Sequence, residues 1–239
     1  MRWINFWLSW RDKMTVFMKR EVARRVFAKE LMSSTYAMRD EGEKSPVYVL
    51  TPLGLKCNRV FIIGALTEKT DVGEDSSIYR IRIADQTGSF IGYIGRYQPE
   101  AYDAIAEINE LSLVAVTAKV RLFEGETRTF VSIRPETISM AEPESRDYWV
   151  VETARSTIKR IKEMERGEGE NVKLAREIYG TDLNEYRRMV REALLRLKEE
   201  YVEETEEEEV ELEDVEEEGE LDLMLVEEEE IDLTKLLED

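Results

Sequence analysis

The sequence predicts a mainly β fold with added helices, in which a five-stranded barrel lies between an N-terminal helix and a group of C-terminal helices. Three observations support this fold class. Five segments of alternating or β-branched character lie between residues 56 and 141. Apolar residues spaced three and four apart, a pattern typical of helices, occur on either side, over residues 14–32 and 148–201. Acidic residues then dominate, which predicts an acidic, mostly disordered tail over residues 203–239.

Charge is distributed unevenly along the chain. The 239 residues include 34 Lys and Arg, 53 Asp and Glu and no histidine, for a net charge of −19. Residues 199–239 hold 23 acidic residues and one basic residue, so residues 1–198 are left with a net charge of +3. The acidity therefore belongs to one end of the chain, and the mildly basic body is compatible with nucleic-acid binding.

The residue types exclude most catalytic chemistry. A single cysteine, Cys57, allows no internal disulfide and no multi-cysteine zinc site. The absence of histidine removes the commonest general base and metal ligand, and no paired-carboxylate motif replaces it. We therefore expect no enzyme activity, no catalytic residue, no metal ligand and no cofactor. No apolar run reaches the roughly 18 residues of a membrane span, and the lone thiol favours the cytoplasm.

The segments that precede the barrel are predicted as an extension and a helix. Residues 1–13 form an apolar extension in which Trp3–Trp10 lies between two arginines. A true start at Met14 is the expected explanation, and an interfacial membrane anchor is the alternative. Residues 14–55 are predicted to hold a helix over Met14–Met32, because apolar residues recur there at four-residue steps, followed by a lead-in to the barrel.

The barrel itself is predicted over residues 56–141. Its strands are expected at Arg59–Lys69, Tyr79–Ile83, Ser89–Gly95, Ser112–Phe123 and Arg128–Arg134, the last ended by Pro135. A helix from Pro99 to Ile108 separates the third strand from the fourth. Five strands with a helix in that place is the order of an OB-fold, a partly open Greek-key barrel.

Residues 142–202 are predicted to be helical. Helices are expected over Tyr148–Met164, over Asn171–Tyr179 and, after a cap at Thr181, as far as Tyr201. The first helix carries a narrow apolar stripe of Val151, Ala154, Ile158 and Ile161. Such a stripe predicts a helical bundle with a partner or a second copy, and packing against the chain's own barrel is the alternative.

One face of the predicted barrel collects arginine and aromatic side chains. Ile81 and Ile83 alternate with Arg80 and Arg82, so the arginines are expected outside. The predicted nucleic-acid-binding residues are Arg80, Arg82, Tyr93, Arg96, Tyr97, Arg121, Phe123, Arg128, Phe130 and Arg134. Guanidinium groups neutralise phosphates and aromatic rings stack on bases, which is typical of single-strand binding. For each ring, burial in the core is the alternative.

Four stretches of the sequence resemble a known archaeal family. They are NRVFIIGALTEKTDVGED at residues 58–75, ADQTG at 84–88, GRYQPEA at 95–101 and RDYWVVETA at 146–154. They are similar to the archaeal replication protein A-associated proteins, OB-fold partners of the single-stranded-DNA-binding protein that distantly resemble the middle subunit of eukaryotic replication protein A. The resemblance covers about Glu21 to Ile161, and Arg20-Glu-Val-Ala and Val26-Phe-Ala28 also look like the beginning of that family.

The resemblance implies two functions of different classes. The first is an OB-fold subunit or accessory of an archaeal replication protein A complex that binds single-stranded DNA in replication and repair. The second is an interaction subunit that binds little DNA and docks a partner through its helix and acidic tail. In both cases the expected partner is a larger replication protein A subunit in an archaeal cytoplasm.

Overall fold

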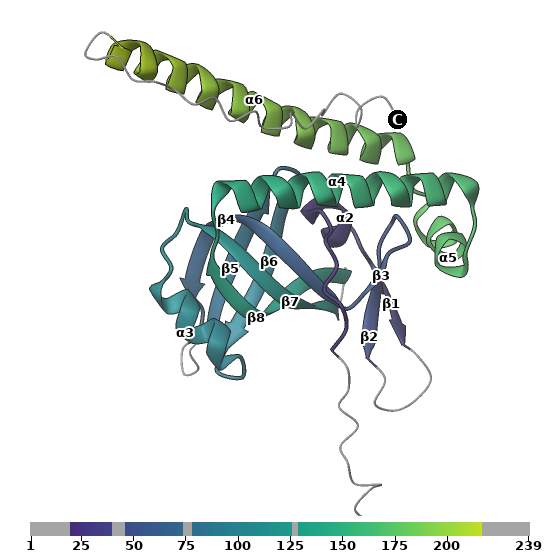
Figure 1. Cartoon of the computed structure of the whole chain (residues 1–239). Helices are drawn as coiled ribbons and strands as arrows, with labels where there is room; N and C mark the ends of the chain where they lie inside the picture. Colours follow the sequence, from purple (N-terminus) through teal and green to yellow (C-terminus); the bar gives the residue numbers. More distant parts are fainter. Residues whose placement is uncertain (1–19, 40–45, 74–77, 126–128, 217–239) are drawn as a thin grey trace, which may run out of the picture.

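Five strands close into a barrel in the order β4-β5-β6-β8-β7. The computed structural model describes residues 20–39, 46–73, 78–125 and 129–216, with side chains as far as residue 200 (Figure 1). The barrel elements are β4 (Arg59–Asp71), β5 (Ile78–Asp85), β6 (Gly88–Gly95), α3 (Pro99–Glu107), β7 (Leu113–Glu124) and β8 (Thr129–Met140). This order, with α3 between the third and fourth strands, confirms the predicted OB-fold.

The barrel closes where β6 meets β8 in parallel. Gly92 pairs with Ile133 at this point, and within the described residues the other neighbouring strands of the barrel pair antiparallel. A Cβ atom on Gly92 would come within 2.9 Å of Ile133 Cγ1 and 3.1 Å of Ile81 Cγ1. The glycine therefore leaves room for two core isoleucines at the closure.

The last strand does not end at Pro135, as the sequence had predicted, but continues to Met140. The β7–β8 register shifts between Thr117 and Ala118, and Pro135 lies opposite Ala118 at this irregularity. A proline cannot donate to a ladder, and a bulge removes the need for it to do so.

The predicted N-terminal helix is mostly wrong in the described residues. Residues 20–27 are largely irregular, with Arg24 bridged in parallel to Val60, and the helix α2 covers only Ala28–Met32. Val26 packs in the barrel core whereas Phe27 packs in a second core beneath the C-terminal helices. Adjacent side chains that point to opposite sides require extended backbone, because a helix places neighbours about 100° apart.

The lead-in to the barrel forms a small sheet that the sequence did not predict. It consists of β1 (Tyr36–Arg39), β2 (Val47–Leu50) and β3 (Lys56–Cys57), paired antiparallel in that order. Figure 1 shows it beside the barrel, near α5 and below α4.

Three helices follow the barrel: α4 (Pro143–Arg166), α5 (Glu170–Tyr179) and α6 (Leu183–Glu216). In Figure 1, α4 lies across the barrel and α6 runs alongside α4. Trp149 anchors α4, because its Nε1 donates a 2.9 Å hydrogen bond to the Phe61 carbonyl of β4. Within the described residues, no helix is long and apolar enough to cross a bilayer.

The apolar stripe of α4 is used within the chain. Val151, Ala154 and Ile161 are at most 9% exposed in the second core, and Ile158 packs against it. This corrects the prediction that the stripe forms a partner surface, and it favours the alternative of intrachain packing. Part of the stripe's cover is the buried face of α6, which includes Val190, Leu194 and Leu197.

Two features of α6 also differ from the prediction. The Thr181 hydroxyl donates to the Pro52 carbonyl at 2.8 Å, and it is Asp182 whose carboxylate accepts from the Asn184 N–H. The helix continues to Glu216, so its backbone extends into the segment expected to be disordered. The extension at residues 1–13 and the tail from residue 217 lie outside the described residues.

Candidate nucleic-acid interface

The outer surface of the β7–β8 ribbon brings predicted cations and rings together. Lys119 pairs with Arg134, Arg121 with Ser132, and Phe123 with Phe130. Val120, Val131 and Ile133 alternate with these residues and are at most 5% exposed in the barrel core. Alternation along each strand therefore places Lys119, Arg121, Phe123, Phe130 and Arg134 on one outward side, here called the ribbon face.

The two phenylalanines of the ribbon face are stacked and accessible. Their ring centroids are 5.4 Å apart with an interplanar angle of 17°. Phe123 is 47% exposed and Phe130 is 44% exposed, so neither is a core residue. This answers, for Phe130, the alternative of burial. Exposure of two apolar rings to water is unfavourable, and the solvent-facing side of the stacked pair can stack with another flat ring.

The arginines of the ribbon face have no acidic partner among the described residues. Arg121 is exposed and Arg134 is partly buried, and neither lies within 4.0 Å of a described carboxylate. Lys119 lies 3.9 Å from Glu136, which in turn binds Arg59 at 2.5 Å. The ribbon face therefore keeps two guanidinium groups available for an anion.

A cavity of about 290 Å³ adjoins the ribbon face beside the start of α3. Arg121 and Arg134 line it together with Arg20, and Tyr97 stands at its wall with 77% of its surface exposed. The Arg96 guanidinium lies 5.4 Å from the centre of the Tyr97 ring. This basic pocket therefore unites Tyr97, Arg121 and Arg134, three of the predicted residues, with one that the sequence analysis did not select.

Arg80 and Arg82 point outward from β5, as predicted, but they share an acidic partner. Arg80 Nη1 binds Glu68 Oε1, and Arg82 Nε lies 3.1 Å from Glu68 Oε2. Arg80 and Arg82 were predicted to bind the phosphates of a nucleic acid. Their shared contact with Glu68 gives a structural reason for two like charges on one face of the strand. Tyr93, the cross-strand partner of Arg80, is 38% exposed.

The Arg80 side of the barrel and the ribbon face adjoin each other at the barrel closure. Gly92 pairs with Ile133, and the Ile133 side chain and a Cβ built on Gly92 both face the barrel core. The next residues, Tyr93 and Arg134, therefore lie on the outer side of neighbouring strands. The outer surface of the barrel thus continues from Arg80 through Tyr93 to Arg134. Arg128 lies outside the described residues.

The turn between β5 and β6 is held by Asp85. Its Oδ1 accepts hydrogen bonds from the Thr87 and Gly88 N–H groups, and its Oδ2 accepts from Ala28 N–H at 2.7 Å. Burial raises the pKa of Asp85, while these hydrogen bonds oppose the rise. The carboxylate is saturated by the turn and by α2, so it serves the fold.

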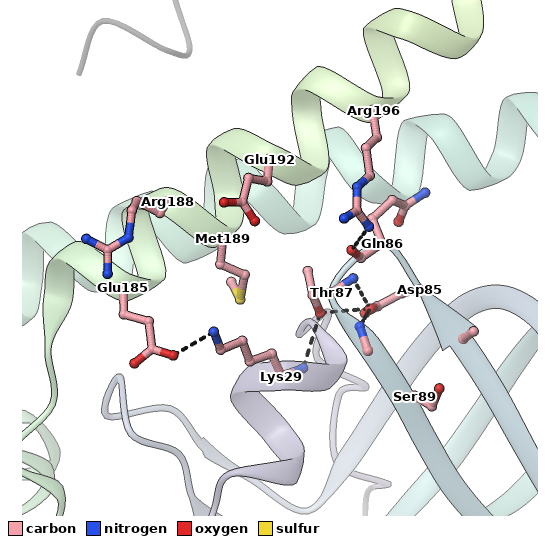
Figure 2. A pocket seen from close by; sticks show the side chains of 12 residues that line it. Lys29, Asp85, Gln86, Thr87, Ser89, Glu185, Arg188, Met189, Glu192 and Arg196 are labelled. Carbon is pink, nitrogen blue, oxygen red and sulfur yellow. Dashed lines mark hydrogen bonds and ion pairs between the residues drawn. The ribbon is translucent and has the colours of Figure 1, made fainter.

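A larger cavity, of about 710 Å³, lies between this turn, α2 and α6 (Figure 2). Its cations already have partners: Lys29 Nζ is 2.6 Å from Glu185, Arg188 Nη2 is 3.9 Å from Asp182, and Arg196 donates to the Gln86 carbonyl at 2.9 Å. None of the described residues that line it is aromatic. The cavity lacks the two features of the ribbon face that suit a nucleic-acid strand. In the described part of the chain, no group of three acidic or cysteine side chains is placed to hold a metal ion.

Sequence reasoning missed Glu68, Lys119 and Arg20 as parts of this surface. Lys119 follows the same strand alternation as Arg121, so parity alone was a signal for it. Glu68 becomes a partner of two arginines only through the irregular β4–β5 register between Leu66 and Glu68. Arg20 lines the pocket from a largely irregular segment that the sequence had predicted as helix.

Comparisons with known proteins give structural similarities at low identity. No model of a known protein family matches the chain, and no curated protein matches it. A mitochondrial single-stranded DNA-binding protein from S. cerevisiae is 17% identical, with a TM-score of 0.29, over 36% of this chain and 94% of that one. The second single-stranded DNA-binding protein of Mycobacterium smegmatis is 15% identical, with a TM-score of 0.31, over 36% and 87%. An OBody bound to hen egg-white lysozyme is 18% identical, with a TM-score of 0.29, over 35% and 94%.

Proposed function

We propose that this chain binds single-stranded DNA through the ribbon face. We further propose that it is not an enzyme and acts as a subunit or accessory of an archaeal replication protein A complex in DNA replication and repair, in the cytoplasm. The observation that carries the proposal is the exposed Phe123–Phe130 stack on the same two strands as Arg121 and Arg134, which have no described acidic partner.

Single strands suit this arrangement better than a duplex does. An exposed ring binds a base by stacking, which requires a base whose face is free. In a duplex the faces are covered by neighbouring base pairs, and only edges and phosphates remain accessible. Arg121 on β7 and Arg134 on β8 supply positive charge for the phosphates of the strand.

The alternative function, an interaction subunit that binds little DNA, has less support. The surface expected to dock a partner was the apolar stripe of α4, and that stripe is buried against α6 and the barrel. Its second element, the acidic end of the chain, is described only as the backbone of α6 to Glu216. Absence of DNA binding in the experiment below would favour this alternative.

The test is a titration of the full chain into fluorescently labelled oligo-dT, followed by anisotropy. Phe123→Ala with Phe130→Ala should weaken binding about five- to 150-fold, the effect of removing a stacked ring. Tyr148→Ala is the matched control, because Tyr148 is a 63% exposed aromatic residue on α4 that is not part of the ribbon face. Thermal unfolding of each variant establishes that the fold is retained. Equal affinity of the wild type and the phenylalanine variant would contradict the proposal.

A further inference from the structure

The basic pocket has two chemically different walls. Arg20, Arg121 and Arg134 line one part of it, and none of them has a carboxylate within 4.0 Å among the described residues. Arg121 and Arg134 also belong to the ribbon face. A strand that lies on the ribbon face therefore reaches the pocket without a break, and its phosphates can remain beside guanidinium groups. This step rests on the proposed function.

The other wall presents one free carboxylate. Glu136 lines the pocket but binds Arg59 at 2.5 Å, so its charge is already compensated. Glu100, in the first turn of α3, is exposed and has no basic partner in the part of the chain that the structure describes. A carboxylate accepts hydrogen bonds and donates none at neutral pH. Glu100 therefore selects for a group that carries N–H donors.

Gln98 and Tyr97 line the pocket together with Glu100. Gln98 Oε1 accepts a 3.1 Å hydrogen bond from Gly95 N–H, which leaves the amide nitrogen of Gln98 to donate. The Tyr97 ring, 77% exposed, offers a flat surface for stacking. The cavity of about 290 Å³ is just below the range of volumes for small-ligand sites, about 300–1,000 Å³, so it suits one nucleotide rather than several.

We propose that the basic pocket holds one unstacked base of the bound strand and prefers guanine. Guanine presents two adjacent donors, N1–H and the N2 amino group, to the Glu100 carboxylate, while its O6 accepts from Gln98 or an arginine. Thymine presents one N–H between two carbonyl oxygens, which a carboxylate repels. Single-stranded bases are selected through these edges once they are splayed out onto aromatic rings.

The experiment compares three labelled strands of equal length: oligo-dT, the same strand with one central dG, and the same strand with deoxyinosine in that place. Deoxyinosine keeps N1–H and O6 but lacks the amino group. The full-length protein should bind the dG strand about tenfold more tightly than oligo-dT, as expected for one good two-point base contact, with the deoxyinosine strand between them. Glu100→Gln should abolish the difference between the three strands, and any effect of the lost negative charge on phosphate binding should be the same for all of them.

The controls separate this role from helix stabilisation. A carboxylate in the first turn also stabilises α3 through the helix dipole, so the unfolding temperature of Glu100→Gln is measured alongside. Glu107→Gln, on the same helix but outside the pocket, should keep the guanine preference. Equal binding of the three strands, or a preference that survives Glu100→Gln, overturns the inference while oligo-dT binding still supports the proposed function. If the wild-type protein bound none of the three strands, both this inference and the proposed function would be overturned.

Discussion

Arg160 makes two hydrogen bonds to Glu30 across the interface between α4 and α2. Arg160 Nη2 lies 2.6 Å from Glu30 Oε2, and Arg160 Nε lies 3.1 Å from Oε1. The Glu30 side chain is fully buried, and that of Arg160 is 10% exposed. Thr51 donates to Glu30 and Thr157 accepts from Arg160, so both charges are satisfied. This pair ties the segment that enters the barrel to the helix that covers it.

Removal of one partner of this pair should destabilise the protein strongly. Arg160→Met leaves the Glu30 carboxylate buried without its counter-charge, which is expected to cost about 3–5 kcal/mol in the free energy of unfolding. Urea unfolding at neutral pH measures it. The double variant Glu30→Met with Arg160→Met should lose less than the single variant, because no charge is left uncompensated. A single variant within about 1 kcal/mol of wild type would contradict this account.

The barrel was predictable because its pattern is local. Ile81 and Ile83 alternate with Arg80 and Arg82, and the structure buries the first two completely while the arginines face outward. The segment before the barrel was not predictable in this way. It passes between two cores, so Val26 and Phe27 are both fully buried on opposite sides. Apolar residues on both sides of the segment produce the four-residue steps that the sequence analysis interpreted as a helix.

Partners of the site residues could not be predicted, because they depend on register and packing. The strand pattern places Arg80 and Arg82 correctly, yet their shared contact with Glu68 follows from a register irregularity. Likewise the stripe of α4 has the spacing of a bundle helix whichever surface covers it. Only the folded chain shows that the cover includes α6.

Glu68 should limit the contribution of its two arginines to DNA binding. Glu68→Gln removes the compensating charge, so Arg80 and Arg82 become available to phosphates and affinity for oligo-dT should rise at low salt. The gain should shrink as salt is added, because released counterions account for it. Titrations of wild type and variant across a salt series measure the effect. An unchanged affinity at every salt concentration would show that the strand does not reach this part of the barrel.

Arg121 and Arg134 should contribute more to the salt dependence of binding than Arg80 and Arg82 do. Each neutralised phosphate of a single strand adds about −0.7 to the slope of log affinity against log salt. Arg121→Gln with Arg134→Gln should therefore reduce the magnitude of the slope by about 1.4. Arg80→Gln with Arg82→Gln is the matched comparison and should reduce it less. The opposite ranking would move the DNA path to the Arg80 side.

Ile161 should behave as a core residue and not as an interface residue. It is 2% exposed in the second core, so Ile161→Ala is expected to cost about 2–5 kcal/mol of unfolding free energy. Urea unfolding and size-exclusion chromatography distinguish the two roles. Ile158→Glu with Ile161→Glu should yield unfolded or aggregated protein. A folded double variant with a smaller oligomeric state would restore the partner surface.

Cys57 should make the stability of the fold decrease at alkaline pH. Its thiol is 2% exposed, and burial, with the nearby Glu30 charge, raises the pKa of Cys57 to about 12. An ordinary cysteine ionises near pH 8.5. Between these values the unfolded chain releases the proton and the folded chain keeps it, so folding becomes less favourable as pH rises, and below this range the thiol has no effect. A difference of about 3.5 units corresponds to about 5 kcal/mol over the whole range. Urea unfolding of wild type and Cys57→Ala from neutral pH to about pH 10 isolates this contribution, because tyrosines and lysines titrate equally in both. The variant should lose less stability than wild type over that interval, and parallel losses would show that the thiol ionises as readily in the folded protein as in the unfolded chain.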